Sequence, residues 1–164
     1  MSPPRIYLPQ PLASGNTAHL DDRAQRHALK VLRLKTGDSL IVFNGEGGEY
    51  AATIEDTRRE GPRITLGEFN DRDCESPLDI ALLQGISRGE KMDYTIQKAV
   101  ELGVTRIVPL TTERSQVRLS GERLARRMQH WQGVIIHACE QCGRNRLPEL
   151  GEMQSLAACL GEHE

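Results

Sequence analysis

The chain has 164 residues, of which 38% are hydrophobic, so it can form one domain with a sizeable core or two small ones. Its formal net charge of −2 excludes a globally basic surface that would attract polyanions from every side. It contains no leader-like segment and no apolar run long enough to span a bilayer. We therefore expect a cytoplasmic protein with reduced cysteines and no membrane partner.

Short β-like segments separated by glycine-rich turns dominate residues 1–72. Strands are predicted at 5–8, 39–43, 49–54 and 63–69. A helix is expected to begin at Asp21 or Asp22, whose carboxylates suit an N-cap, and to end near Leu34. Short strands joined by such turns are typical of a small, twisted, barrel-like sheet.

A polar segment at 70–77 that ends in proline predicts a boundary between a domain at 1–72 and a second domain at 76–164. After it, apolar runs at 80–83 and 107–110 predict two strands buried on both faces. Between these runs, helical spacing predicts a helix that starts with a capping box and ends at a glycine. The capping box pairs Ser87 with Glu90, and the terminating glycine is Gly103.

Strand, helix and strand in this length form a βαβ unit, which makes the two strands parallel. Open parallel sheets bind ligands beyond the carboxyl ends of their strands, so segments 85–91 and 111–118 should form the working edge. These segments contain Arg88, Arg114 and Arg118. From 106 to 146 there are eight arginines against three glutamates, a balance of +5 that suits a phosphate-bearing partner. A solvated helix face explains the same charge equally well.

A long helix is predicted after Ser120, ending at Cys142. Its apolar stripe consists of Leu124, Met128, Trp131, Ile135, Ala138 and Cys142. A stripe this regular favours core or a subunit interface over a cofactor site. Off the stripe lie Arg123, Arg126, Arg127 and His130, for which we expect a solvated face. Cys139 and Cys142 supply too few ligands for a structural zinc site, so both thiols are expected to pack and no metal is expected.

The end of this helix carries a carboxylate, two amides and two guanidiniums: Glu140, Gln141, Arg144, Asn145 and Arg146. Such clustering can be ordinary capping and surface pairing. Together with Arg114 and Arg118 at the predicted strand-end edge, it favours a substrate site. No nucleophile triad, phosphate-binding loop or dinucleotide fingerprint can be assembled from the sequence.

Seven segments carry a resemblance to a known family. They are Pro4-Arg5-Ile6-Tyr7, Val31-Leu32-Arg33 and the segments 87–92, 96–98, 101–104, 113–115 and 139–149. In this order and spacing, across essentially the whole chain, they resemble the RsmE family. Its members are bacterial 16S ribosomal RNA uridine N3-methyltransferases of the SPOUT class.

The resemblance implies an α/β protein with a small N-terminal β-barrel: a PUA-like RNA-binding domain followed by a SPOUT, trefoil-knot type parallel-sheet domain. It also implies S-adenosylmethionine as cofactor, 16S ribosomal RNA in the small ribosomal subunit as partner, a homodimer when full length, and no DNA partner. The family holds the cofactor with a Gly-Pro-Glu-Gly-Gly type motif and a later Leu-Arg-x-Glu-Thr type motif, and neither occurs in these 164 residues. We therefore expect an incomplete SPOUT domain in a truncated, inactive chain without cofactor-binding residues.

The family's chemistry requires a uridine anion to be stabilised as the N3 proton leaves. Arg114 and Arg144 are the predicted catalytic residues, with Glu140 as base or organiser. A glutamate pKa of about 4.3 would have to rise to roughly 6–7 for a base, and nearby arginines act in the opposite direction, so the organising role is favoured. The predicted RNA contacts are Arg5, Tyr7, Arg33, Arg88, Lys91, Arg118, Gln141, Asn145 and Arg146.

Two other readings remain open from the sequence. One is a stand-alone RNA-binding module whose α/β part is only structural. The other is a small-molecule α/β enzyme that uses the loop at 85–91. A reading frame that continues past Glu164 would favour the methyltransferase over the stand-alone RNA-binding module. Failure to bind structured RNA at low salt would favour the small-molecule enzyme.

Overall fold

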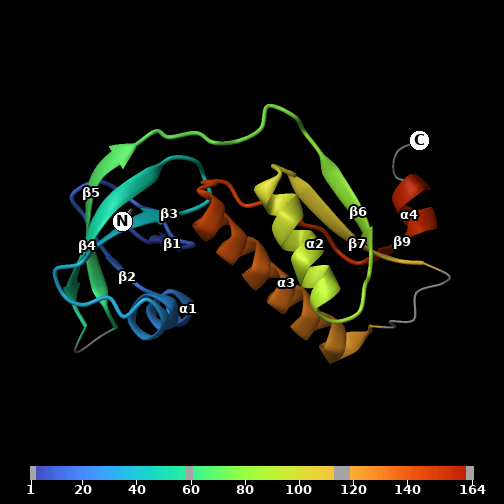
Figure 1. The fold of residues 1–164 in the computed structure, drawn as a ribbon, viewed down its shortest axis with the longest axis horizontal. Coiled ribbons are helices and arrows are strands. Elements are labelled where there is room, and N and C mark those ends of the chain that lie inside the picture. The colour runs from blue at the N-terminus through green and yellow to red at the C-terminus, as the bar shows by residue number, and fades with distance from the viewer. Residues whose placement is uncertain (1–2, 58–60, 113–118, 162–164) are drawn as a thin grey trace. The chain divides into compact units, whose positions relative to one another are not determined.

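The computed structural model describes residues 3–57, 61–112 and 119–161. The chain forms two compact units (Figure 1). The first contains residues 1–75 together with Gly143–Arg146, and the second contains 76–142 and 147–164. Among the described residues, no helix combines the length and the apolar character needed to cross a membrane.

The first unit is built on a five-stranded mixed sheet. Its elements are β1 (Arg5–Tyr7), β2 (Thr17–His19), α1 (Asp22–Gln25), the π-helical η1 (Arg26–Val31), β3 (Ser39–Phe43), β4 (Glu49–Asp56) and β5 (Arg63–Asn70). The strand order is β1-β3-β4-β5-β2, with β1 parallel to β3 and the other pairs antiparallel. Alternate strand residues and one side of the helix form its core, which includes Ile6, Leu40, Val42, Ile54, Ile64, Leu66, Ala24 and Ala28.

All four strands predicted in this region are present. The helix begins as predicted, because the Asp21 carboxylate accepts a hydrogen bond from the Ala24 N–H at 2.7 Å. It ends at Val31 rather than Leu34, since Arg33 adopts a φ of +58°. Strand β2 was not predicted. Only its central residue, Ala18, is buried, so its three residues carry no readable alternation.

The second unit is an α/β layer. Its elements are β6 (Ala81–Gly85), α2 (Glu90–Glu101), β7 (Arg106–Thr111), α3 (Gly121–Cys142), β8 (Glu149–Leu150), β9 (Gln154–Ser155) and α4 (Leu156–Gly161). Strand β7 pairs in parallel with β6 on one side and with β8 and then β9 on the other. Helices α2 and α3 lie side by side (Figure 1). The predicted βαβ unit is therefore confirmed.

Two local predictions in this unit are wrong. The capping box does not form: α2 starts at Glu90, its N-cap is Gly89 with φ +58°, and no side chain caps it. The first predicted strand is not buried on both faces, because Ile80 and Leu83 are 41% and 37% exposed. The second strand is buried as predicted.

The apolar stripe of α3 is present. Trp131, Ile135 and Ala138 are buried, while Leu124, Met128 and Cys142 are half-buried. Cys139 and Cys142 are free thiols. Gly103 and Gly143 follow α2 and α3 with φ values of +93° and +89°, as expected of glycines that end helices.

Candidate functional site

The carboxyl end of β6 opens into a small hollow. Gly85 ends the strand opposite Leu110, and the Ile86 N–H donates to the Leu110 carbonyl at 3.0 Å, which fixes the start of the following loop. The hollow has a volume of about 130 Å³. It is lined by Ile86, Ser87, Arg88, Gly89, Met92, Leu119, Arg127 and Trp131. The strand-end edge thus brings a guanidinium from the loop, Arg88, together with one from α3, Arg127.

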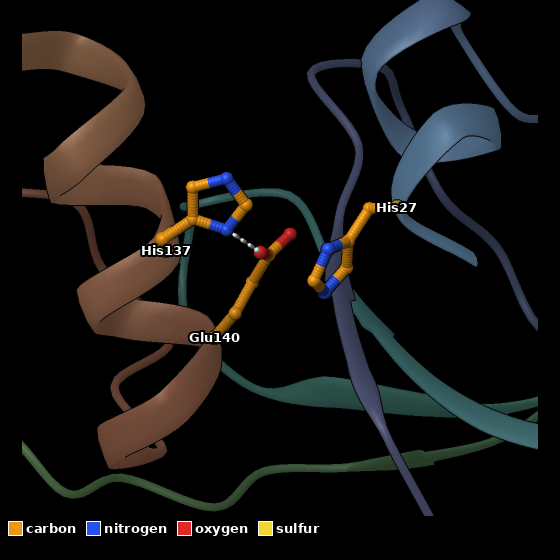
Figure 2. Close-up of side chains that lie close together, drawn as sticks. All are labelled: His27, His137 and Glu140. Carbon is orange, nitrogen blue, oxygen red and sulfur yellow. Dashed lines mark ion pairs between the residues drawn. The ribbon is translucent and has the colours of Figure 1, made fainter. Parts of the chain in front are cut away.

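Of the predicted catalytic residues, Glu140 and Arg144 lie within the described part of the chain. Arg114, the third of them, and Arg118, a predicted RNA contact, lie outside the described residues. Glu140 is buried near the end of α3, and His137 points toward it from the preceding turn, with Nδ1 3.1 Å from a Glu140 carboxylate oxygen (Figure 2). The catalytic roles of Arg114, Arg144 and Glu140 stay predictions.

Segment Gly143–Arg146 belongs to the first unit and is held there by a buried polar network. Its centre is Glu49 on β4. This carboxylate accepts hydrogen bonds from the Arg5 guanidinium and, at 3.2 Å, from the Asn145 amide. Arg5 also donates to Asn145 and to the Arg144 carbonyl, and its guanidinium carbon lies 4.9 Å from the Phe43 ring centre. These hydrogen bonds involve charged groups in surroundings of low dielectric constant. They are therefore stronger than the same hydrogen bonds exposed to water.

Burial alone would raise the pKa of Glu49. The hydrogen bond and charge of Arg5, the Asn145 amide and the charge of Arg72 outweigh that effect and hold the pKa below its ordinary value. Glu49 is therefore ionised at neutral pH. Its negative charge stabilises the position of segment Gly143–Arg146 through the hydrogen bonds to Arg5 and Asn145.

Arg144 is the second attachment point. Its guanidinium donates to the Glu75 carboxylate through Nε at 2.9 Å and through a second nitrogen, and its side chain is 5% exposed. The other Glu75 oxygen accepts from the Arg146 N–H at 3.3 Å. Arg72 donates to the Gly143 carbonyl at 3.2 Å, while the Arg72 carbonyl accepts from Asn145 at 2.9 Å. The segment is thus bound along its whole length.

The remaining predicted RNA contacts of the first unit are less buried. Arg146 is exposed, and its guanidinium lies against Gly47 in the hairpin turn between β3 and β4. Arg33 is exposed after η1. Tyr7 packs against Phe43 with ring centres 5.6 Å apart, and burial raises the pKa of its hydroxyl.

The structure thus gathers three predicted site residues, Arg5, Arg144 and Asn145, in one network. Their acidic partners, Glu49 and Glu75, were not predicted. Glu75 lies in the segment interpreted as a domain boundary, and Glu49 lies at a strand start 96 residues before Asn145. In the second unit, Arg88, Lys91 and Gln141 are exposed.

Family models match both units. A model described as an RNA methyltransferase domain matches residues 74–164, and one described as an RNA methyltransferase PUA domain matches 20–66. The chain belongs to the RNA methyltransferase family. The resemblance inferred from the sequence motifs is thereby confirmed, as is the fold of a PUA-like domain followed by a SPOUT-type methyltransferase domain.

Individual members of the family are similar over most of this chain. The ribosomal RNA small subunit methyltransferase E of Buchnera aphidicola from Acyrthosiphon pisum is 36% identical over 147 residues, covering 90% of the chain and 58% of that protein. The protein of the same name from Bacillus subtilis is 24% identical, covering 92% of the chain and 59% of the relative. The chain therefore spans under two thirds of these relatives.

Two solved structures share the fold closely. The Neisseria gonorrhoeae ribosomal RNA small subunit methyltransferase E, solved bound to S-adenosyl methionine, has a TM-score of 0.92 and 42% identity, covering 97% of this chain and 65% of that one. A putative methyltransferase from Legionella pneumophila, also solved with this cofactor, has a TM-score of 0.96 and 40% identity, covering 99% and 67%.

Proposed function

We propose that the protein methylates N3 of a uridine in 16S ribosomal RNA, with S-adenosylmethionine as methyl donor. The observation that carries this proposal is the 36% identity, over 90% of the chain, to a ribosomal RNA small subunit methyltransferase E. The complete enzyme would work in the cytoplasm on RNA of the small ribosomal subunit, as a homodimer.

S-adenosylmethionine does not fit the hollow at the strand-end edge. Pockets that enclose ligands of drug size have volumes of roughly 300 Å³ or more, whereas this hollow measures about 130 Å³. Its charged lining side chains, Arg88 and Arg127, would also repel the sulfonium cation. We assign no described residue to the cofactor.

The chemistry at the nucleobase sets the requirements for the protein. Uridine N3 lies on the Watson–Crick edge, so the base must be unpaired or splayed out before it can react. Its N3 proton must leave, which spreads negative charge over N3, O2 and O4. A guanidinium remains charged and offers forked donors, so it suits stabilisation of that anion. Arg114 is the stronger candidate, because Arg144 is already held by Glu75.

RNA contact would come from the exposed basic residues. In the first unit these are Arg33 and Arg146, with Tyr7 as a partly buried aromatic, and in the second unit Arg88 and Lys91. Arg118 is proposed as a further contact from its sequence position, and Gln141 as a polar one. Arg5 and Asn145 would act indirectly, by fixing the segment that carries Arg146.

The proposal is tested with the product of the complete gene. Small ribosomal subunits lacking the modification are incubated with enzyme and S-adenosylmethionine, and the RNA is digested to nucleosides for mass spectrometry. We expect 3-methyluridine to form only when enzyme and cofactor are both present. Absence of methyl transfer, or a methyl group on another atom, would contradict the proposal.

Arg114→Ala in that complete enzyme should lower the rate of methylation by roughly 10²-fold or more, because the uridine anion loses its charged donor. RNA affinity should change little, since one contact among many is removed. Single-turnover rates and RNA binding would be measured together. Arg106→Ala is the matched control, because Arg106 pairs with Glu149. Full activity of the Arg114 variant would refute this assignment.

A further inference from the structure

The first half of α3 presents a basic face over a second hollow. This hollow has a volume of about 430 Å³ and is lined by Leu119, Arg123, Arg126, Arg127 and His130. It shares Leu119 and Arg127 with the smaller hollow at the strand-end edge, which contains Arg88. The two hollows therefore adjoin. We call the surface formed by Arg88, Arg123, Arg126, Arg127 and His130 the arginine groove.

The carboxylates near the groove neutralise only part of its charge. Arg126 lies 3.1 Å from Glu122, but both side chains are at least 80% exposed, so water weakens this pair. His130 lies 2.7 Å from Asp93 of α2. Within the described part of the chain, Arg88, Arg123 and Arg127 have no carboxylate within ion-pair distance. Three guanidiniums thus remain for an external anion.

The basic side chains are not a by-product of core packing. The apolar stripe of the same helix is buried separately, with Trp131 only 2% exposed. Arg123 and Arg127 are one helical turn apart, where like charges repel each other by a few tenths of a kcal/mol. The attraction of both guanidiniums to a bound polyanion would offset this repulsion.

We infer that the arginine groove binds the phosphate backbone of the RNA substrate. This inference rests on the proposed function and adds a contact surface on the methyltransferase unit, in which Arg123 and Arg127 are the principal residues. Guanidiniums match phosphate oxygens with paired donors. Trp131 is buried and does not offer its ring to a base. The guanidiniums would contact the backbone, which carries no base identity.

The test uses this chain and a fluorescently labelled hairpin RNA taken from the small-subunit sequence, with affinity measured by anisotropy between about 50 and 200 mM salt. The variant R123Q/R127Q keeps helix-forming residues but removes two charges. We expect the slope of log affinity against log salt to fall by about 2, because each lost phosphate contact removes about one. Binding at the low-salt end should weaken roughly tenfold.

Two further variants separate a local contact from net charge. K98Q/R106Q removes the same charge from the second unit, at residues already paired with Glu101 and Glu149, and should leave the slope unchanged. R123K/R127K restores the charge as ammonium groups and should recover most of the slope. Circular dichroism checks that each variant is folded.

Wild-type affinity and slope in R123Q/R127Q would overturn the inference, as would an equal loss in K98Q/R106Q. Failure of the proposed function would appear in the methyl-transfer assay and not in RNA binding. In that case the complete enzyme transfers no methyl group to uridine, whatever the arginine groove variants do to RNA binding.

Discussion

Glu49 illustrates how a buried carboxylate is kept ionised in this chain. Its side chain is 8% exposed and that of its partner Arg5 is 10% exposed. Removing one member of such a pair leaves the other charge buried without compensation, which costs more than the pair itself contributes. The stability of the first unit should therefore be sensitive to this residue.

We expect Glu49→Gln to lower the free energy of unfolding by roughly 3 kcal/mol at pH 7. The pKa of Glu49 is lowered from 4.5 in the folded state. Its contribution is therefore complete above that ordinary value and is lost as the pH falls through the folded-state pKa. The unfolding free energy of the wild-type chain should fall on acidification as Glu49 is protonated. The variant has no carboxylate at this position, so this part of the pH dependence should be missing. Urea unfolding at pH 7 and at lower pH measures both effects.

Glu46→Gln is the control for this measurement. Glu46 lies in the exposed hairpin turn, where its carboxylate accepts a hydrogen bond from the neighbouring Asn44 amide. Its substitution should change stability by a few tenths of a kcal/mol. Equal unfolding free energies for the wild type and Glu49→Gln would show that the Arg5–Glu49 pair contributes nothing.

At the scale of elements, α3 offers a matched pair of glycines. Gly133 lies inside the helix with open space where an added Cβ would lie, whereas Gly143 follows the helix with φ +89°. Gly133→Ala should raise the unfolding free energy by about 0.5–1 kcal/mol. Gly143→Ala should lower the unfolding free energy by roughly 1–2 kcal/mol, because alanine is strained at this positive φ. The added Cβ would in addition lie 3.1 Å from the Arg72 guanidinium. Thermal unfolding measures both variants. Midpoint temperatures that shift in the same direction would contradict the opposite roles given to Gly133 and Gly143.

The elements were largely predictable because their signals are local. The apolar run at 40–43, the alternation of Ile64 and Leu66 with polar neighbours, and the helical spacing from 124 to 138 arise within a few residues and survive in the fold. The capping box failed for a physical reason: Gly89 adopts a positive φ that the Ser87–Glu90 arrangement does not anticipate. β2 was missed because three residues with one buried side chain resemble a loop.

At the scale of the whole molecule, the first unit is not a continuous stretch of chain, because it includes Gly143–Arg146. No sequence pattern indicated this. The hydrogen bonds that define it join residues 69 to 140 positions apart, as in the Arg144–Glu75 and Arg5–Asn145 pairs. Opposite charges that far apart cannot be matched by spacing alone. The sequence therefore predicts a polar cluster at 140–146 but not its partners Glu49 and Glu75, which the fold brings to it.

Asn145→Ala should therefore weaken structure that is remote in sequence. Without the amide that bridges Glu49 and the Arg72 carbonyl, amide hydrogens in β1 and β4 should exchange faster by roughly one order of magnitude, a cost of 1–2 kcal/mol. Hydrogen–deuterium exchange with mass spectrometry resolves these strands. Gln141→Ala, at an exposed position, should leave them unchanged. Unaltered protection in the Asn145 variant would show that the segment does not stabilise the first unit.

The discontinuous first unit constrains how such proteins can be recombined. A chimera that joins residues 1–75 of this chain to the remainder of a relative would keep Glu49 but lose this chain's own Asn145. The first unit of the chimera would then be completed by the relative's peptide. To keep this chain's hydrogen-bond network, a graft should carry residues 143–146 together with 1–75, because the first unit does not coincide with one contiguous stretch of sequence.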